Sequence, residues 1–195
     1  MPVRGDTPSG IVIQQMVSAL LLSVLLQANV AEIEALSACL DALARTAKPR
    51  LFADVAKYDQ KPRWKEFATQ KALEKARTGE NLFSTFSVWR DKSGSLLVVG
   101  NFSSPSGDWA EETAYIFRPA GSLAKLDSTL NTFIGNVSIS RVRWFDASAR
   151  AIKSRSAVVD LDTRKPKKSS PEFAGWKPTV YLKLDQLPIQ ALLKK

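Results

Sequence analysis

Two pairs of residues have types and spacings that suit hydrolysis. Ser122 and Lys125 stand three residues apart, in the S-x-x-K spacing that lets a lysine assist a serine nucleophile. Asp160 and Asp162 are two carboxylates separated by one residue, a pair that suits glycoside hydrolysis or the binding of a hard cation. A small hydrolase that uses either pair is therefore one hypothesis for the function.

The setting of both pairs favours a non-catalytic interpretation. In a working S-x-x-K site the serine opens a helix, so that the lysine stands beside it one turn later. Here the motif leaves a turn and enters a strand, where residues three apart point to opposite faces. The two aspartates share one face of a strand end, where acids are usually solvated. We predict no catalytic residue and regard an enzyme as the less favoured class.

Composition excludes further kinds of chemistry. The 195 residues include no histidine, which removes Ser-His-Asp and Cys-His catalysis and zinc sites with histidine ligands. The single cysteine, Cys39, excludes an intramolecular disulfide and any metal site built from several cysteines. We therefore expect no metal and no cofactor.

The chain is basic, but the excess charge is unevenly distributed. Eight Lys and Arg against two Asp and Glu from Arg164 to Lys195 give this segment +6 of the total +9. Much of it lies in a turn-rich loop suited to weak contact with anionic surfaces, through Arg164, Lys165, Lys167 and Lys168. No aromatic residues alternate with these cations, so the pattern does not favour nucleic acid as a partner.

The middle of the chain predicts an antiparallel meander. In three places an aromatic residue ends an apolar run and a short turn of Asp, Pro, Ser, Gly or Ala follows, which is typical of a hairpin. The predicted strands are Leu82–Trp89, Ser95–Phe102, Trp109–Arg118, Ser122–Phe133, Val137–Phe145 and Ile152–Leu161, with a last one at Thr179–Leu184.

Alternation along these strands predicts which faces are buried. The second strand is apolar on both sides and should be central. The fourth should place Ala124, Leu126 and Leu130 on one face, opposite Lys125 and Asp127. Gly100 and Gly135 are expected to mark bulges or bends.

The second face of the sheet is the predicted binding surface. Alternation places an aromatic and arginine group there, with Thr129 beside it, and such a surface suits a protein or small-molecule ligand. The predicted site residues are Trp89, Tyr115, Phe117, Arg141 and Arg143. The alternative is that the N-terminal helices or the C-terminal segment cover this face, because large exposed apolar patches are rare.

Two helices are predicted ahead of the sheet. An apolar stripe of Ile33, Leu36, Leu40 and Leu43 has helical spacing and ends near Pro49. After a short connecting segment at Leu51–Tyr58, a second helix over Lys61–Thr78 should lie across one face of the sheet.

Cys39 allows two interpretations. Leu36-Ser37-Ala38-Cys39 resembles the lipobox of bacterial lipoproteins, which would imply a lipidated cysteine. Glu32 and Glu34 lie just upstream, where such a signal stays apolar. The helical stripe instead favours Cys39 as a small packed helix residue.

The N-terminus predicts export. Ile11 to Leu26 carries no charge, and its apolar block has the length of a signal-peptide core and is short for a membrane span. Residues 1–31 are thus a signal peptide or an N-terminal apolar helix, and residues 32–195 a single domain, with helices over 32–78 and the sheet over 82–184. The protein is exported, to the periplasm or the medium, in the first case and cytoplasmic in the second.

Together these patterns predict an α+β fold, with N-terminal helices packed on a curved antiparallel meander sheet of six to seven strands. The favoured function is an exported, non-catalytic binding module that uses the open face of the sheet. A third hypothesis, beside the hydrolase, is an envelope assembly or structural subunit whose sheet edge adds to a partner.

Overall fold

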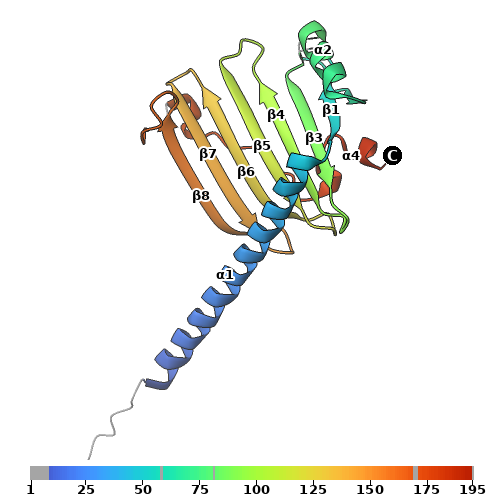
Figure 1. The fold of residues 1–195 in the computed structure, drawn as a ribbon. Helices are drawn as coiled ribbons and strands as arrows, with labels where there is room; N and C mark the ends of the chain where they lie inside the picture. Colours follow the sequence, from blue (N-terminus) through green and yellow to red (C-terminus); the bar gives the residue numbers. More distant parts are fainter. Residues whose placement is uncertain (1–8, 58, 81, 169–170, 195) are drawn as a thin grey trace, which may run out of the picture.

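The structure is a computed structural model that describes residues 9–57, 59–80, 82–168 and 171–194, without the side chains of 9–26, 28, 79–80 and 171–172. Its centre is one antiparallel sheet in the order β2-β1-β3-β4-β5-β6-β7-β8, so the α+β class with an antiparallel sheet is confirmed. Figure 1 shows the long helix α1 (Ser9–Thr46) crossing one face of this sheet diagonally. The six meander strands are β3 (Ser84–Arg90), β4 (Leu96–Ser103), β5 (Trp109–Phe117), β6 (Leu123–Thr132), β7 (Val137–Phe145) and β8 (Ala151–Asp160).

The sheet has eight strands rather than six to seven, because two strands lie ahead of the meander. β1 (Arg50–Asp54) occupies the segment expected to be a connection, and β2 (Trp64–Phe67) occupies the start of the expected second helix. β1 pairs with β2 on one side and β3 on the other, which explains its run of three buried residues. Predicting a helix from Lys61 was therefore wrong for its first half.

The second helix, α2 (Gln70–Glu80), begins only after Thr69, whose hydroxyl accepts a hydrogen bond from the N–H of Ala72 at 3.1 Å. It also does not lie across a face of the sheet. Leu73 and Ala76 pack with residues of β1, β2 and Leu82 at the β1 end of the sheet (Figure 1).

The three hairpins predicted from the repeated turn pattern are present, and their turns share one end of the sheet, here called the turn end. Gly94 and Gly121 take positive φ angles of 92° and 82° in the first two turns. In the third turn Ala149 has a φ of 60°, and the Asp146 carboxylate accepts the N–H groups of Ser148 and Arg150.

The apolar stripe of α1 faces the sheet as predicted. Ile33 and Leu40 are buried, with Leu36 and Leu43 partly buried beside them, against side chains of β4, β5 and β7. Cys39 lies on the same helix with its side chain exposed, so the interpretation of Cys39 as a packed residue was wrong. We call this side of the sheet the α1 face.

One carboxylate fixes α1 to the sheet. Glu34 accepts a hydrogen bond from Trp144 Nε1 at 2.6 Å and forms an ion pair with Lys125 Nζ at 2.9 Å. Burial acts to raise the pKa of Glu34, but the hydrogen bonds from Lys125 and Trp144 outweigh it and hold the pKa below its ordinary value of 4.5. The contact therefore favours the charged form and locks the helix against β6 and β7.

The opposite face is covered by the C-terminal segment, and we call it the covered face. Leu187, Ile189 and Leu193 pack there among buried side chains of β1 and β3 to β7. This segment contains α3 (Pro171–Ala174), the short 3-10 helix η1 (Leu184–Gln186) and α4 (Gln190–Leu193). The strand expected over Thr179–Leu184 is reduced to one bridge between Ser122 and Lys183.

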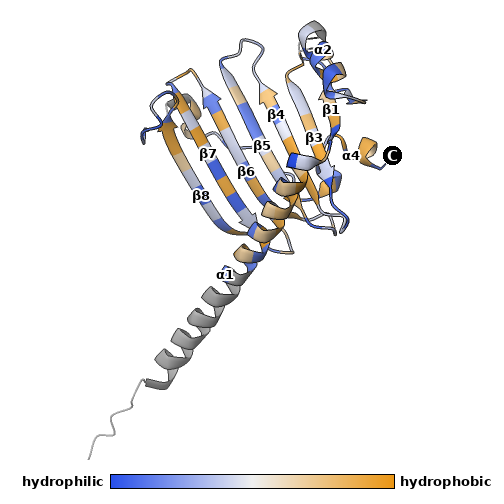
Figure 2. Cartoon of the chain, viewed as in Figure 1, coloured by the Kyte–Doolittle hydropathy of each residue, from blue (hydrophilic) through white to orange (hydrophobic). Residues whose placement is uncertain are grey.

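Because both faces are covered, β4 is buried on both sides, as predicted. Leu96 and Val98 join the cluster under the C-terminal segment, whereas Leu97 and Val99 join the cluster under α1. Figure 2 shows the contrast with the outer strands, where hydrophilic and hydrophobic residues alternate along β7.

The predicted signal peptide falls mainly outside the described side chains. No helix over the described residues has the length and apolar character needed to cross a membrane. The backbone continues as α1 from Ser9, and this part of the helix runs away from the sheet (Figure 1).

Replacing Gly100 with alanine should destabilise the fold. Gly100 is paired in register on both sides and marks no bulge. A Cβ at this position would lie 2.7 Å from Phe86 Cε1 and 2.8 Å from Phe102 Cε2. We expect G100A to lose about 1–3 kcal/mol in free energy of unfolding, measured by urea denaturation.

The control is G175A, which has no atom within 4 Å of the new Cβ, so its free energy of unfolding should stay near that of the parent protein. Equal stability of the two variants would contradict the close packing of the two rings.

Candidate ligand-binding groove

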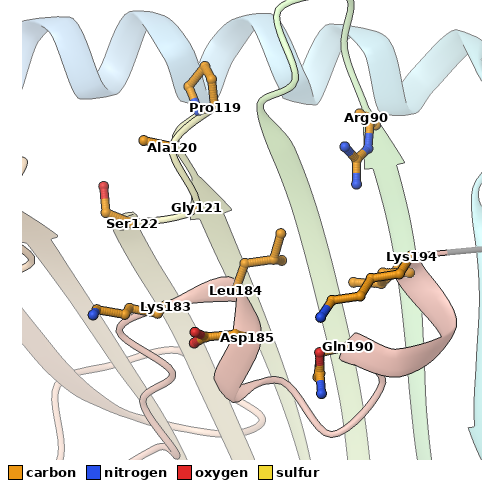
Figure 3. A pocket seen from close by; sticks show the side chains of 11 residues that line it. Arg90, Pro119, Ala120, Gly121, Ser122, Lys183, Leu184, Asp185, Gln190 and Lys194 are labelled. Carbon is orange, nitrogen blue, oxygen red and sulfur yellow. The ribbon is translucent and has the colours of Figure 1, made fainter.

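A groove of about 500 Å³ lies at the turn end of the sheet. Its walls come from the end of β3, the β5–β6 turn and the C-terminal helices, as Figure 3 shows. The lining residues are Arg90, Pro119, Ala120, Gly121, Ser122, Lys183, Leu184, Asp185, Gln190, Leu193 and Lys194.

Backbone hydrogen bonds hold the two walls together. Leu184 N–H donates to the Gly121 carbonyl at 2.9 Å, and Leu123 N–H donates to the Leu182 carbonyl at the same distance. These bonds flank the bridge between Ser122 and Lys183, so the β5–β6 turn and the C-terminal segment are joined side by side. The groove is therefore built on paired backbone rather than on side chains alone.

The rim of the groove is cationic. Arg90, Lys183 and Lys194 line it against one acid, Asp185. Over the described residues, the ion pairs within 4.0 Å involve none of these four side chains. In Figure 3 Arg90 and Lys194 lie on one side of Leu184, with Arg90 above Lys194, and Lys183 lies on the other side. Three cations against one acid leave a net positive charge, which attracts an anion to this position.

Part of the groove lining is apolar. Pro119, Leu184 and Leu193 contribute hydrocarbon surface, with Leu193 buried and Pro119 exposed. Gln190 adds one polar group, since its side-chain oxygen is buried and has no hydrogen-bond partner within the described structure. A ligand that carries a donor group could hydrogen-bond to this oxygen, because a buried acceptor without a protein partner carries a cost in free energy.

The structure places the S-x-x-K pair apart. Ser122 lines the groove. The Lys125 ammonium lies on the α1 face, where it contacts Glu34 at 2.9 Å and the Ser37 hydroxyl at 3.4 Å. The lysine is thus already engaged by the helix, and the geometry gives Ser122 no base from this residue.

The two aspartates form a turn rather than a catalytic pair. Asp160 accepts hydrogen bonds from the N–H and hydroxyl of Thr163 at 2.9 and 3.0 Å, and pairs with Lys167 Nζ at 2.9 Å. The Thr163 N–H first, and then Lys167, hold the pKa of Asp160 far below its ordinary value. Asp162 accepts a hydrogen bond from the Asn136 amide at 2.7 Å. Carboxylates engaged in this way are poor general acids.

The five predicted binding residues do not share one face. Trp89 lies on the α1 face and donates a hydrogen bond from Nε1 to the Ala47 carbonyl at 3.0 Å. Tyr115 and Phe117 lie on the covered face, where neither has any exposed surface. For Tyr115 and Phe117, the alternative hypothesis holds: the C-terminal segment covers them.

The two arginines stack on aromatic rings of the covered face. The Arg141 guanidinium lies 5.5 Å from the centre of the Trp176 ring, and Arg143 lies 5.3 Å from that of Phe145. The Nε atom of Arg141 is buried without a hydrogen-bond partner within the described structure. Thr129 lies elsewhere, in a small hollow of the α1 face beside Asp127.

Two polar contacts clamp the C-terminal segment onto this face. The Tyr115 hydroxyl donates to the Thr179 carbonyl at 2.8 Å, and Trp176 Nε1 donates to Glu111 at 3.2 Å. Burial holds the pKa of the Tyr115 hydroxyl well above its ordinary value, so this group stays neutral and remains a donor.

The basic loop runs beside β8. Lys167 is paired with Asp160, whereas the side chains of Arg164, Lys165 and Lys168 are exposed. No group of three or more His, Cys, Asp or Glu side chains within the described residues has an arrangement that could hold a metal ion.

Sequence reasoning did not identify the groove. Arg90 lies 93 positions before Lys183 and 104 before Lys194, so no local motif joins all three cations. Only the return of the C-terminal segment to the turn end brings them together.

In comparisons with known proteins, no family model, curated protein or solved structure matches this chain.

The clamp predicts different effects at two neighbouring tyrosines. Y115F removes the hydrogen bond to the Thr179 carbonyl and should lower the free energy of unfolding by about 1 kcal/mol. Y181F is the matched control, because the Tyr181 ring packs on Tyr115 but its hydroxyl has no hydrogen-bond partner within the described structure. Urea denaturation of both variants checks this. An equal loss in the two variants would contradict the assigned clamp.

Proposed function

We propose that the protein is an exported, non-catalytic binding module that captures a small amphiphilic anion in the groove at the turn end of the sheet. The observation that carries the proposal is the set of cations Arg90, Lys183 and Lys194, which have no ion-pair partners in the described structure and share the groove with apolar lining residues. Cations attract the charged group of such a ligand, and burial of its apolar body adds affinity.

The groove replaces the aromatic face as the proposed binding surface. Tyr115 and Phe117 are buried beneath the C-terminal segment, so a ligand could reach them only if that segment moved. The groove needs no such movement, because its rim side chains Lys183 and Lys194 are exposed. A site that is already formed binds at a lower conformational cost than one that must open.

The residues considered for hydrolysis support a binding role. Lys125 is engaged by Glu34, and Asp160 by Thr163 and Lys167. Ser122 remains in the groove, where its hydroxyl can donate a hydrogen bond to an anion without acting as a nucleophile.

Export is supported by the uncharged apolar block from Ile11 to Leu26 near the start of α1. Among its described side chains, Val30 is the first to pack against the sheet cluster, and Gln27 and Asn29 are exposed. Removal of residues 1–31 as a signal peptide would leave the stripe from Ile33 to Leu43 in place. Cleavage there would also remove Val30, which is partly buried against this cluster, but it would keep the buried residues Ile33 and Leu40.

Ligand capture can be measured with 1-naphthyl phosphate as the probe and uncharged 1-naphthol as its counterpart. We expect isothermal titration calorimetry to show stronger binding of the phosphate by the parent protein. R90E and K194E should each weaken it about tenfold, a difference of about 1.4 kcal/mol.

The matched control is K92E, which reverses an exposed charge in the β3–β4 turn outside the groove lining. It should change the affinity by less than about twofold, as expected for a screened surface charge. Equal effects of K92E and K194E, or equal binding of the charged and uncharged probes, would exclude the groove as the site.

The export proposal predicts a processed chain. Expression of the full chain in a bacterial host should yield protein outside the cytoplasm whose first tryptic peptide, read by mass spectrometry, begins close to residue 32. An unprocessed N-terminus on protein confined to the cytoplasm would refute export while leaving the groove proposal unaffected.

A further inference from the structure

The strand β8 forms one edge of the sheet and is exposed over much of its length. It is the last strand in the sheet order, and Lys153 to Ala157 are all exposed. In Figure 1 it is the outermost strand beside β7. An edge strand carries backbone N–H and C=O groups that lack a neighbouring strand.

The basic loop closes only one end of this edge. Lys167 N–H donates to the Val158 carbonyl at 3.0 Å, and Asp160 N–H donates to the Lys165 carbonyl at 2.8 Å. Because the backbone groups of every second residue point to the same side of a strand, those of Ser154 and Ser156 point to the same outer edge as Val158. Neither pairs with the loop, whose one bridge to β8 is at Val159 and Pro166. Ser154 and Ser156 therefore offer pairing groups to another strand.

The charge along this edge is positive. Lys153 and Arg155 belong to β8, and the loop beside its end adds the exposed side chains of Arg164, Lys165 and Lys168. Near the end of β8, Asp160 pairs with Lys167 and Asp162 accepts from Asn136. Arg155 also lies within electrostatic range of Glu34 and Asp127 on the α1 face, which offset part of its charge. Like charges would meet if two copies of the chain paired through β8, which disfavours a second copy as the partner.

We infer that the open edge of β8 binds an extended acidic segment of a partner protein, which adds to the sheet as a further strand. The backbone of Ser154 and Ser156 would supply the hydrogen bonds, and acidic side chains at alternate positions would lie beside Lys153 and Arg155. An extended polypeptide fits better than nucleic acid or a lipid surface, because only a polypeptide backbone can pair with the free N–H and C=O groups. This surface is separate from the groove, so neither proposal depends on the other.

The probe is a ten-residue peptide in which glutamate alternates with valine, labelled with an uncharged dye and titrated with the full chain in fluorescence anisotropy. We expect saturable binding, and at least tenfold weaker binding of a peptide with lysine in place of each glutamate. R155E should weaken binding of the acidic peptide at least fivefold, whereas K92E, distant from β8, should change it less than twofold.

Backbone pairing is tested by S154P, which removes one outward N–H. Proline is tolerated on an edge strand where its nitrogen faces solvent, so the fold should persist, as checked by circular dichroism. We expect at least tenfold weaker binding by S154P. A second test that needs no variant uses an acidic peptide with alternating D and L residues, which has the same charge but cannot form a regular strand and should bind at least tenfold less.

Two results would overturn the inference. One is equal binding of the regular and the D,L peptide, and the other is equal or stronger binding of a ten-nucleotide oligothymidylate or of anionic phosphatidylserine vesicles. Either result would show that the edge attracts negative charge in general. If S154P fails to fold, the peptide comparison and R155E still decide the question.

Discussion

The packing of the C-terminal segment against the sheet is the constraint on which the rest of the structure depends. Leu187 and Ile189 are almost completely buried among side chains of β1 and β3 to β7. Burial of a side chain of this size stabilises a fold by about 1.5–3 kcal/mol, so these two contacts alone are comparable to a sizeable part of a domain's net stability. Without them the aromatic residues of the covered face would be exposed to water, and the groove would lose one wall.

This packing also separates the roles of the two faces. On the α1 face a helix crosses the sheet and leaves polar residues of the outer strands exposed, with the Glu34 carboxylate fixing its position against Lys125 and Trp144. On the covered face, aromatic residues meet a segment that is held by backbone and side-chain hydrogen bonds. The groups that we propose for binding therefore lie around the sheet rather than on its faces, in the groove at the turn end and along the edge strand β8.

The local features of the fold were predictable because they depend on a few neighbouring residues. Glycine and aspartate in the turns marked the hairpins, and the Ile33 to Leu43 stripe marked the packed half of α1. The two-sided apolar run of β4 indicated a strand covered on both faces. Each of these patterns lies within one helix, strand or turn, so it could be read from consecutive residues without knowing which distant segments they contact.

Features that depend on distant partners were not predictable. β1 and β2 are short, and only their pairing with each other and with β3 makes them strands. A register shift after Ile116 places Ala124 on the α1 face, while Leu126 lies on the covered face, so the predicted common face for these residues was wrong. The register likewise separates Trp89 from Tyr115, and the groove combines Arg90 with residues near the C-terminus.

The central claim is that the C-terminal segment is attached to the β5–β6 turn, and an engineered disulfide tests it directly. Bridge partners in an antiparallel pair have Cα atoms about 4.5–5.5 Å apart, within the range that a disulfide spans. In a chain carrying Cys39→Ser, the pair Ser122→Cys and Lys183→Cys should form a disulfide within one molecule under mild oxidation, as measured by thiol titration and mass spectrometry. Ser122→Cys with Lys57→Cys, which lies beyond β1 at the other end of the sheet, should keep both thiols free. Free thiols in the first pair, or cross-linking no faster than in the second, would contradict the account.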